Sequence, residues 1–82
     1  MNVTVYTKPG CVQCEWTKKM LDKQGTDYQV IDVSESTMAQ DILRELGYTA
    51  LPVVVVNNGP RTGHWSGFKL DKLRGLKDTG GY

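Results

Sequence analysis

The sequence predicts an α/β protein whose four-stranded mixed sheet carries helices on both faces. Three observations predict this class. Apolar, β-branched runs alternate with helical patterns, a Cys-x-x-Cys pair follows the first run, and a strong turn signal joins the last two runs. The expected element order is β-α-β-α-β-β-α. The 82 residues (1–82) suit a single small domain, because the apolar content fills only one core, and residues 79–82 are expected to fray.

The first half of the chain predicts a strand, a helix and a second strand. Residues 3–6 predict the first strand and residues 8–10 a turn, and a helix over residues 11–24 is ended by Gly25. The second strand is expected over residues 28–33. In a β-α-β unit of this kind, the two strands are parallel and the crossover is right-handed.

A second helix is expected after these strands. Residues 34–37 offer helix caps, and residues 37–40 match a capping box. Gly47 is a natural stop signal for this helix. The apolar positions at helical spacing fall on one helical face, which consists of Met38, Ile42, Leu43 and Leu46.

A hairpin and a short helix complete the expected fold. The β-branched run over residues 52–56 is typical of a buried strand. Residues 57–60, Asn-Asn-Gly-Pro, predict a turn into a further strand over residues 62–66, and the hairpin adds antiparallel strands to the sheet. A last helix is indicated by Leu70, Leu73 and Leu76.

Composition and charge argue against several classes of function. The formal net charge is +1 without a basic cluster, which disfavours binding to nucleic acid or to anionic membranes. No apolar stretch approaches the ~20 residues that span a bilayer. The first residues lack the basic start and apolar segment of a secretory signal. We therefore expect a cytoplasmic protein without membrane or nucleic-acid partners, and nothing in the sequence requires more than a monomer.

The chemistry of the chain centres on its two cysteines, Cys11 and Cys14. Cys11 stands at the start of the expected first helix, where N–H groups without partners and the helix dipole stabilise a thiolate. Cys14 follows one turn later on nearly the same face, close enough to form a disulfide with Cys11. We predict dithiol–disulfide exchange without a bound cofactor: Cys11 attacks a disulfide, and Cys14 resolves the mixed intermediate.

Three segments carry a resemblance to a known family. They are Cys11-Val12-Gln13-Cys14, Leu51-Pro52, and Trp65-Ser66-Gly67-Phe68. With the first two, the chain resembles the thioredoxin-fold superfamily. With the third, it is similar to the glutaredoxin-sized NrdH-redoxins, and the resemblance extends from Val3 to about Leu76.

The resemblance implies a thioredoxin/glutaredoxin-like fold and a particular place in electron transfer. Such proteins accept electrons from NADPH through thioredoxin reductase and deliver them to a class Ib ribonucleotide reductase. Pro52 matches the family's cis-proline beside the dithiol. The chain departs from the family where Arg-Pro usually follows the phenylalanine, because Lys69-Leu70 stands there. Lysine keeps the charge of arginine but lacks its planar, two-pronged donor.

Other residues are candidates for supporting the cysteines or for binding partners. Lys8 is expected to tune the thiolate or to contact an acidic partner, and an ordinary solvated lysine is the alternative. Gln13 is expected to face incoming disulfides. His64 is interpreted as a solvated histidine. For Trp16, Trp65 and Phe68, a place in the core or at its edge is the alternative to partner contact. The predicted partner-binding residues are Val12, Trp16, Leu51, Trp65, Ser66, Gly67 and Phe68.

Two other functions compete with this interpretation. A glutathione-dependent glutaredoxin needs an acidic grip near the start of the last helix, and Asp71 keeps that question open. A non-enzymatic module that binds metal or senses redox state through the Cys-x-x-Cys pair is the second. Zinc takes four ligands, and only His64 joins the two cysteines in the usual set, so such a site would have to bridge a dimer.

Overall fold

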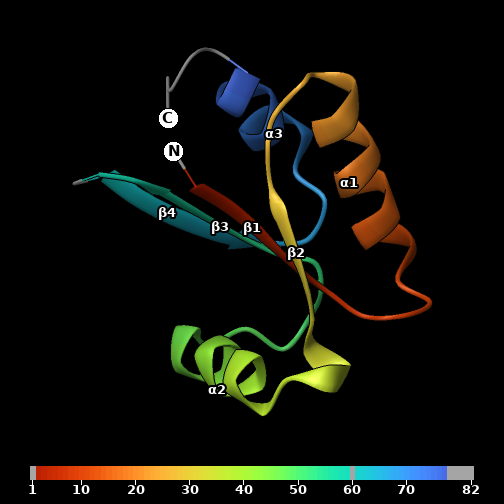
Figure 1. Ribbon diagram of the computed structural model, residues 1–82, viewed down its shortest axis with the longest axis vertical. Coiled ribbons are helices and arrows are strands. Elements are labelled where there is room, and N and C mark those ends of the chain that lie inside the picture. The colour runs from red at the N-terminus through yellow and green to blue at the C-terminus, as the bar shows by residue number, and fades with distance from the viewer. Residues whose placement is uncertain (1, 60, 78–82) are drawn as a thin grey trace.

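The structure, a computed structural model, describes residues 2–59 and 61–77, and its elements follow the predicted order (Figure 1). The predicted α/β class is confirmed. The strands and helices are β1 (Asn2–Thr7), α1 (Val12–Lys23), β2 (Gln29–Asp32), the 3-10 turn η1 (Val33–Glu35), α2 (Thr37–Leu46), β3 (Val53–Asn58), β4 (Arg61–Ser66) and α3 (Leu70–Lys77). Within the described ranges, no helix is long and apolar enough to cross a membrane.

The four strands form one mixed sheet in the order β2-β1-β3-β4. Strand β1 pairs in parallel with β2, where Val5 lies opposite Val30, and antiparallel with β3, where Val5 lies opposite Val54. Strand β4 pairs antiparallel with β3 and forms the other edge. Helices α1 and α3 cover one face of the sheet, and α2 covers the other (Figure 1). The mixed sheet with helices on both faces was therefore predicted correctly.

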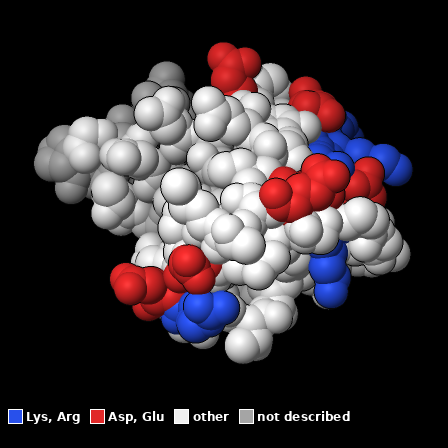
Figure 2. Space-filling model, turned by 60° about the horizontal axis from the view of Figure 1, so that its bottom comes forward, with Lys and Arg blue, Asp and Glu red and all other residues white. Residues whose placement is uncertain are grey.

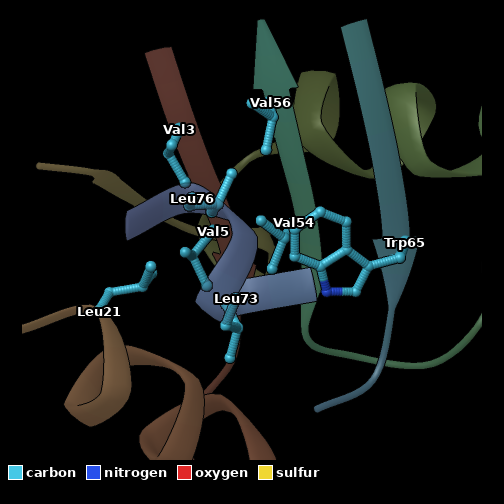
Figure 3. Close-up of a cluster of buried hydrophobic side chains, with 8 residues drawn as sticks. All are labelled: Val3, Val5, Leu21, Val54, Val56, Trp65, Leu73 and Leu76. Atoms are coloured by element: carbon cyan, nitrogen blue, oxygen red, sulfur yellow. The ribbon is translucent and has the colours of Figure 1, made fainter. Parts of the chain in front are cut away.

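Each face of the sheet has its own cluster of buried side chains. Under α1 and α3, valines of β1 and β3 meet leucines of the two helices and one tryptophan of β4, as Figure 3 shows: Val3, Val5, Leu21, Val54, Val56, Trp65, Leu73 and Leu76. Alternation along the strands sends the intervening residues to the opposite face. There the buried cluster under α2 consists of Tyr6, Ala39, Leu43 and Val53.

Of the four apolar residues expected on one face of α2, only Leu43 is buried. Ala39 and Leu43 are buried against the sheet, whereas the side chain of Met38 is 72% exposed and that of Ile42 is 39% exposed. Met38, Ile42 and Leu46 form a parallel stripe about 100° further round the helix. Ala39 has a small side chain, and it occupies the buried position where α2 meets the sheet.

The capping box expected at residues 37–40 is also absent. The N-cap of α2 is Ser36, whose Oγ accepts a hydrogen bond from the backbone N–H of Ala39 at 3.1 Å. The side-chain amide of Gln40 donates instead to the carbonyl of Val33 at 2.7 Å. The cap therefore lies one residue before the predicted one.

Two element boundaries differ from their predictions. Strand β2 ends at Asp32, because the Asp32 carboxylate accepts the N–H of Ser34 at 2.9 Å and begins the turn η1. In the hairpin, Asn57 and Asn58 are not turn residues but pair with β4. Gly59 forms part of the connection, with φ of 65°. Pro60 and the predicted frayed end, residues 79–82, lie outside the described residues.

Candidate active site

Cys11 and Cys14 lie where β1 leads into α1, and they form a disulfide. Their Cα atoms are 5.2 Å apart. Cys11 is the N-cap of α1, and its Sγ accepts the backbone N–H of Cys14 at 3.1 Å. That N–H and the positive end of the helix dipole stabilise negative charge on the Cys11 sulfur when the disulfide is open.

The two cysteines differ strongly in their access to solvent. Cys14 is 0% exposed and lies on the inner face of α1 with Thr17 and Leu21. Cys11 is only partly buried. The Thr17 hydroxyl donates to the carbonyl of Gln13 at 2.9 Å, which fixes the first turn of the helix. A thiol or disulfide from another molecule can therefore reach Cys11 but not Cys14.

Hydrogen bonds join two loops that are distant in sequence to each other and to the Cys-x-x-Cys segment. The bond between Leu51 and Pro52 is cis, as the resemblance implied, and the carbonyl of Pro52 accepts the N–H of Gly67 at 2.8 Å. The hydroxyl of Ser66 donates to the carbonyl of Ala50 at 2.8 Å. These two hydrogen bonds join the end of β4 to the segment that precedes β3.

A third hydrogen bond attaches this pair of loops to the Cys-x-x-Cys segment. The side-chain oxygen of Gln13 accepts the backbone N–H of Phe68 at 3.2 Å. Gly67 has φ of +89°, a conformation that strains other residues, and a Cβ placed there would lie 3.7 Å from that same oxygen. Sequence reasoning missed this contact, because it joins residues that are 55 positions apart.

An apolar surface lies beside Cys11. Val12 is 59% and Trp16 is 51% exposed, one helical turn apart on α1. The ring of Trp16 packs edge to face against Phe68, with centroids 6.0 Å apart. Trp65 does not belong to this surface, because it is 3% exposed in the core under α3, so its predicted role as a contact residue is corrected. Leu51 is partly buried against the cluster under α2.

Two other predicted residues have surroundings that the sequence did not define. Lys8 is exposed in the turn before Cys11 and forms no ion pair within the described part of the chain. His64 is exposed but not simply solvated, since its Nδ1 lies 2.7 Å from the Tyr48 hydroxyl and the two rings pack edge to face. Among residues 2–59 and 61–77, no three His, Cys, Asp or Glu side chains come together in a group that could hold a metal.

Comparison with known proteins relates this geometry to a family. The family model of glutaredoxin matches residues 3–59, which include both cysteines and Pro52. Over 76 residues the chain is 37% identical to the glutaredoxin-like protein NrdH of Escherichia coli K12, covering 93% of this chain and 89% of that relative. The chain belongs to the glutaredoxin family, in its NrdH-type branch.

Solved structures agree with the assignment to the NrdH-type glutaredoxins. The NrdH-redoxin of Escherichia coli superimposes with a TM-score of 0.84 at 37% identity, covering 93% of this chain and 95% of that one. Oxidised mitochondrial thioredoxin 3 of Saccharomyces cerevisiae superimposes with a TM-score of 0.70 at 27% identity, covering 94% and 76%. The predicted recognition is confirmed. An NrdH-type glutaredoxin with a formed Cys11–Cys14 disulfide is a thiol–disulfide oxidoreductase.

Proposed function

We propose that this NrdH-type protein carries electrons from NADPH, through thioredoxin reductase, to protein disulfides in the cytoplasm. Its proposed acceptor is the disulfide of a class Ib ribonucleotide reductase. The observation that carries the proposal is the asymmetry of the two cysteines, with Cys11 accessible at a helix N-terminus and Cys14 buried behind it. The thioredoxin-like activity profile ascribed to the Escherichia coli NrdH-redoxin supports a reductase as the donor.

In the proposed reaction, Cys11 is the nucleophile. Its thiolate attacks one sulfur of the acceptor disulfide, forms a mixed disulfide and releases the other acceptor sulfur as a thiolate. The thiolate of Cys14 then attacks Cys11 Sγ, restores the Cys11–Cys14 bond and frees the second acceptor sulfur. The acceptor takes up two protons and leaves as a dithiol, two electrons richer. Two electrons from NADPH, delivered by the reductase, regenerate the Cys11–Cys14 dithiol.

The surrounding loops are proposed to hold the acceptor. Pro52 and Gln13 fix the positions of the segments on either side of the disulfide through their bonds to Gly67 and Phe68. Lys8, exposed before Cys11, favours an anionic sulfur by its charge. The acceptor is expected to lie across the partly or fully exposed residues of α1 and of these loops, Val12, Trp16, Leu51, Ser66, Gly67 and Phe68.

A glutathione-dependent glutaredoxin is the competing function. Asp71 lies in the first turn of α3, where an acidic grip on glutathione would be expected. The N–H of Phe68, close to that helix start, donates to Gln13, so a glutathione carboxylate would have to displace Gln13 in order to bind there. This occupied donor favours the reductase-dependent function.

A coupled assay of NADPH oxidation tests the proposed donor. One arm contains thioredoxin reductase and the other contains glutathione with glutathione reductase, and both contain the same disulfide substrate. We expect turnover in the first arm only. Turnover in the second arm alone would contradict the proposal and identify a glutathione-dependent glutaredoxin. The variant Cys11→Ser is the control and is expected to be inactive in both arms.

A further inference from the structure

An open hollow of about 260 Å³ lies on α1 beyond the redox-active end of the helix. Its lining is formed by Trp16, Lys19, Met20, Lys23 and Phe68. The Trp16–Phe68 ring pair gives it an apolar side, and half of the Trp16 surface remains accessible to solvent. The hollow is connected to the disulfide through Phe68, whose N–H is bonded to Gln13 between the two cysteines.

The charged residues that line the hollow are both lysines. Lys18 next to them is paired with Glu15 at 2.6 Å, whereas Lys19 and Lys23 form no ion pair with any residue in the described ranges. They stand at i and i+4 on one helix, and both residues are exposed. Both ammonium groups are therefore available to pair with a carboxylate of another molecule.

The positive charge is a property of the hollow's lining and not of the chain as a whole. The net charge of the chain is only +1. On the opposite face of the sheet, two carboxylates flank the apolar stripe of α2, and Figure 2 shows acidic and some basic side chains around a broad area of uncharged residues there. The hollow on that face is lined by Met38, Asp41, Ile42, Glu45 and Leu46. The two hollows therefore differ in the charges of their linings, with two lysines in the hollow on α1 and two carboxylates in the hollow on α2.

We propose that the hollow on α1 binds the segment that flanks the disulfide of the acceptor protein, and that this segment carries an apolar side chain and carboxylates. The apolar side chain contacts Trp16 and Phe68, and the carboxylates pair with Lys19 and Lys23. The inference deepens the proposed function and rests on it. The small, open hollow accommodates one or two side chains, which suits an extended segment better than the broad face of a folded reductase.

The helix geometry sets the spacing that such a segment needs. Lys19 and Lys23 follow Cys11 by eight and twelve residues, which is about 12 and 18 Å along α1 at about 1.5 Å per residue. An extended chain covers these lengths in about four to six residues. The carboxylates are therefore expected about four to six residues from the cysteine that Cys11 attacks.

Single-turnover reduction of synthetic disulfide peptides tests this proposal. The protein is reduced chemically, the reductant is removed, and the rate of peptide reduction is measured by acid quench and chromatography. Three peptides share one disulfide and one leucine in the flank but carry Glu-Glu, Gln-Gln or Lys-Lys about five residues away. At low salt, the Glu-Glu peptide is expected to react about threefold or more faster than the Gln-Gln peptide, and the Lys-Lys peptide slowest. The differences should shrink at high salt.

Charge-neutralising variants assign the preference to the hollow. The double variant Lys19→Ala, Lys23→Ala is expected to react with all three peptides at similar rates. The control is Arg44→Ala, an exposed cation on the far side of the sheet, which should keep the full preference. Trp16→Ala should slow the reaction with the leucine-containing peptides more than with peptides in which serine replaces the leucine.

Three results would overturn the proposal. The first is equal rates for the three peptides. The second is a charge preference that Arg44→Ala removes as fully as the double variant does. The third is a double variant that reduces the peptides at the wild-type rates and loses only its turnover with thioredoxin reductase in the coupled assay. The last result would make the hollow a reductase site. Because the protein is reduced chemically, failure of these experiments is distinguishable from failure of the proposed electron donor, which only the coupled assay tests.

Discussion

The hydrogen bond between Gln13 and Phe68 joins the Cys-x-x-Cys segment to the loop before α3, and its removal is predicted to loosen that loop. Gln13→Met removes the acceptor while keeping side-chain length and helix propensity. A neutral hydrogen bond contributes a net ~0.5–1.5 kcal/mol. This one is 3.2 Å long and lies at an exposed position where water replaces the lost partner, so the lower part of the range applies, about 0.5–1 kcal/mol.

Amide hydrogen exchange at Phe68, followed by NMR, measures this effect. A loss of about 0.5–1 kcal/mol predicts roughly two- to fivefold faster exchange in Gln13→Met. Gln13→Glu is the matched control, because its carboxylate retains an acceptor oxygen at the same distance along the side chain, and it should exchange like the wild type. Equal exchange at Phe68 in all three proteins would refute the proposed connection between the loops.

Three further predictions concern stability and are measured by urea unfolding. The Tyr28 hydroxyl donates to Asp22 at 2.8 Å, and burial, this bond and the charges of Asp22 and Glu15 raise the pKa of Tyr28 to about 12. The unfolded chain loses this proton near pH 10. The advantage of wild type over Tyr28→Phe should therefore be constant below pH 10 and decline as pH rises from 10 through 12, and an advantage unchanged at pH 12 would contradict the shift. Ser36→Ala should lower the free energy of unfolding by about 1 kcal/mol, and Thr37→Ala should lower it clearly less. A larger loss for Thr37→Ala would instead make Thr37 the N-cap, as the sequence predicted. Leu73→Ala, at a fully buried position, should cost about 2–5 kcal/mol, and an equal loss in the exposed control Met38→Ala would contradict the assignment of the core.

Much of the fold could be predicted from the sequence because its signals are local. The β-branched run before Asn57, the glycine after α2 and the cysteine pair after a strand each reflect the conformation of a few neighbouring residues. The side of α2 that is buried is not a local property. Ala39 and Leu43 form one stripe and Met38 and Ile42 another, one residue apart, and only packing on the sheet selects between them.

The candidate site, too, could be predicted from the sequence only in part. Cys11 at a helix start and Cys14 one turn behind it follow from spacing alone. Strand alternation places Trp65 and His64 on opposite faces of the sheet, but it does not say which one enters the core. The contact of Gln13 with Phe68 and the hollow on α1 depend on how α1 and the loop before α3 meet, so no pattern in the sequence indicates them.

Trapping a mixed disulfide tests most directly whether Cys11 attacks and Cys14 resolves. Cys14→Ser is incubated with an excess of a disulfide peptide, and the product is digested and mapped by mass spectrometry. We expect a stable adduct through Cys11, because the group that would release it is gone. Under the same conditions, Cys11→Ser should form almost no adduct, since Cys14 is 0% exposed. Comparable adducts in both variants, or none in Cys14→Ser, would contradict the two-cysteine mechanism.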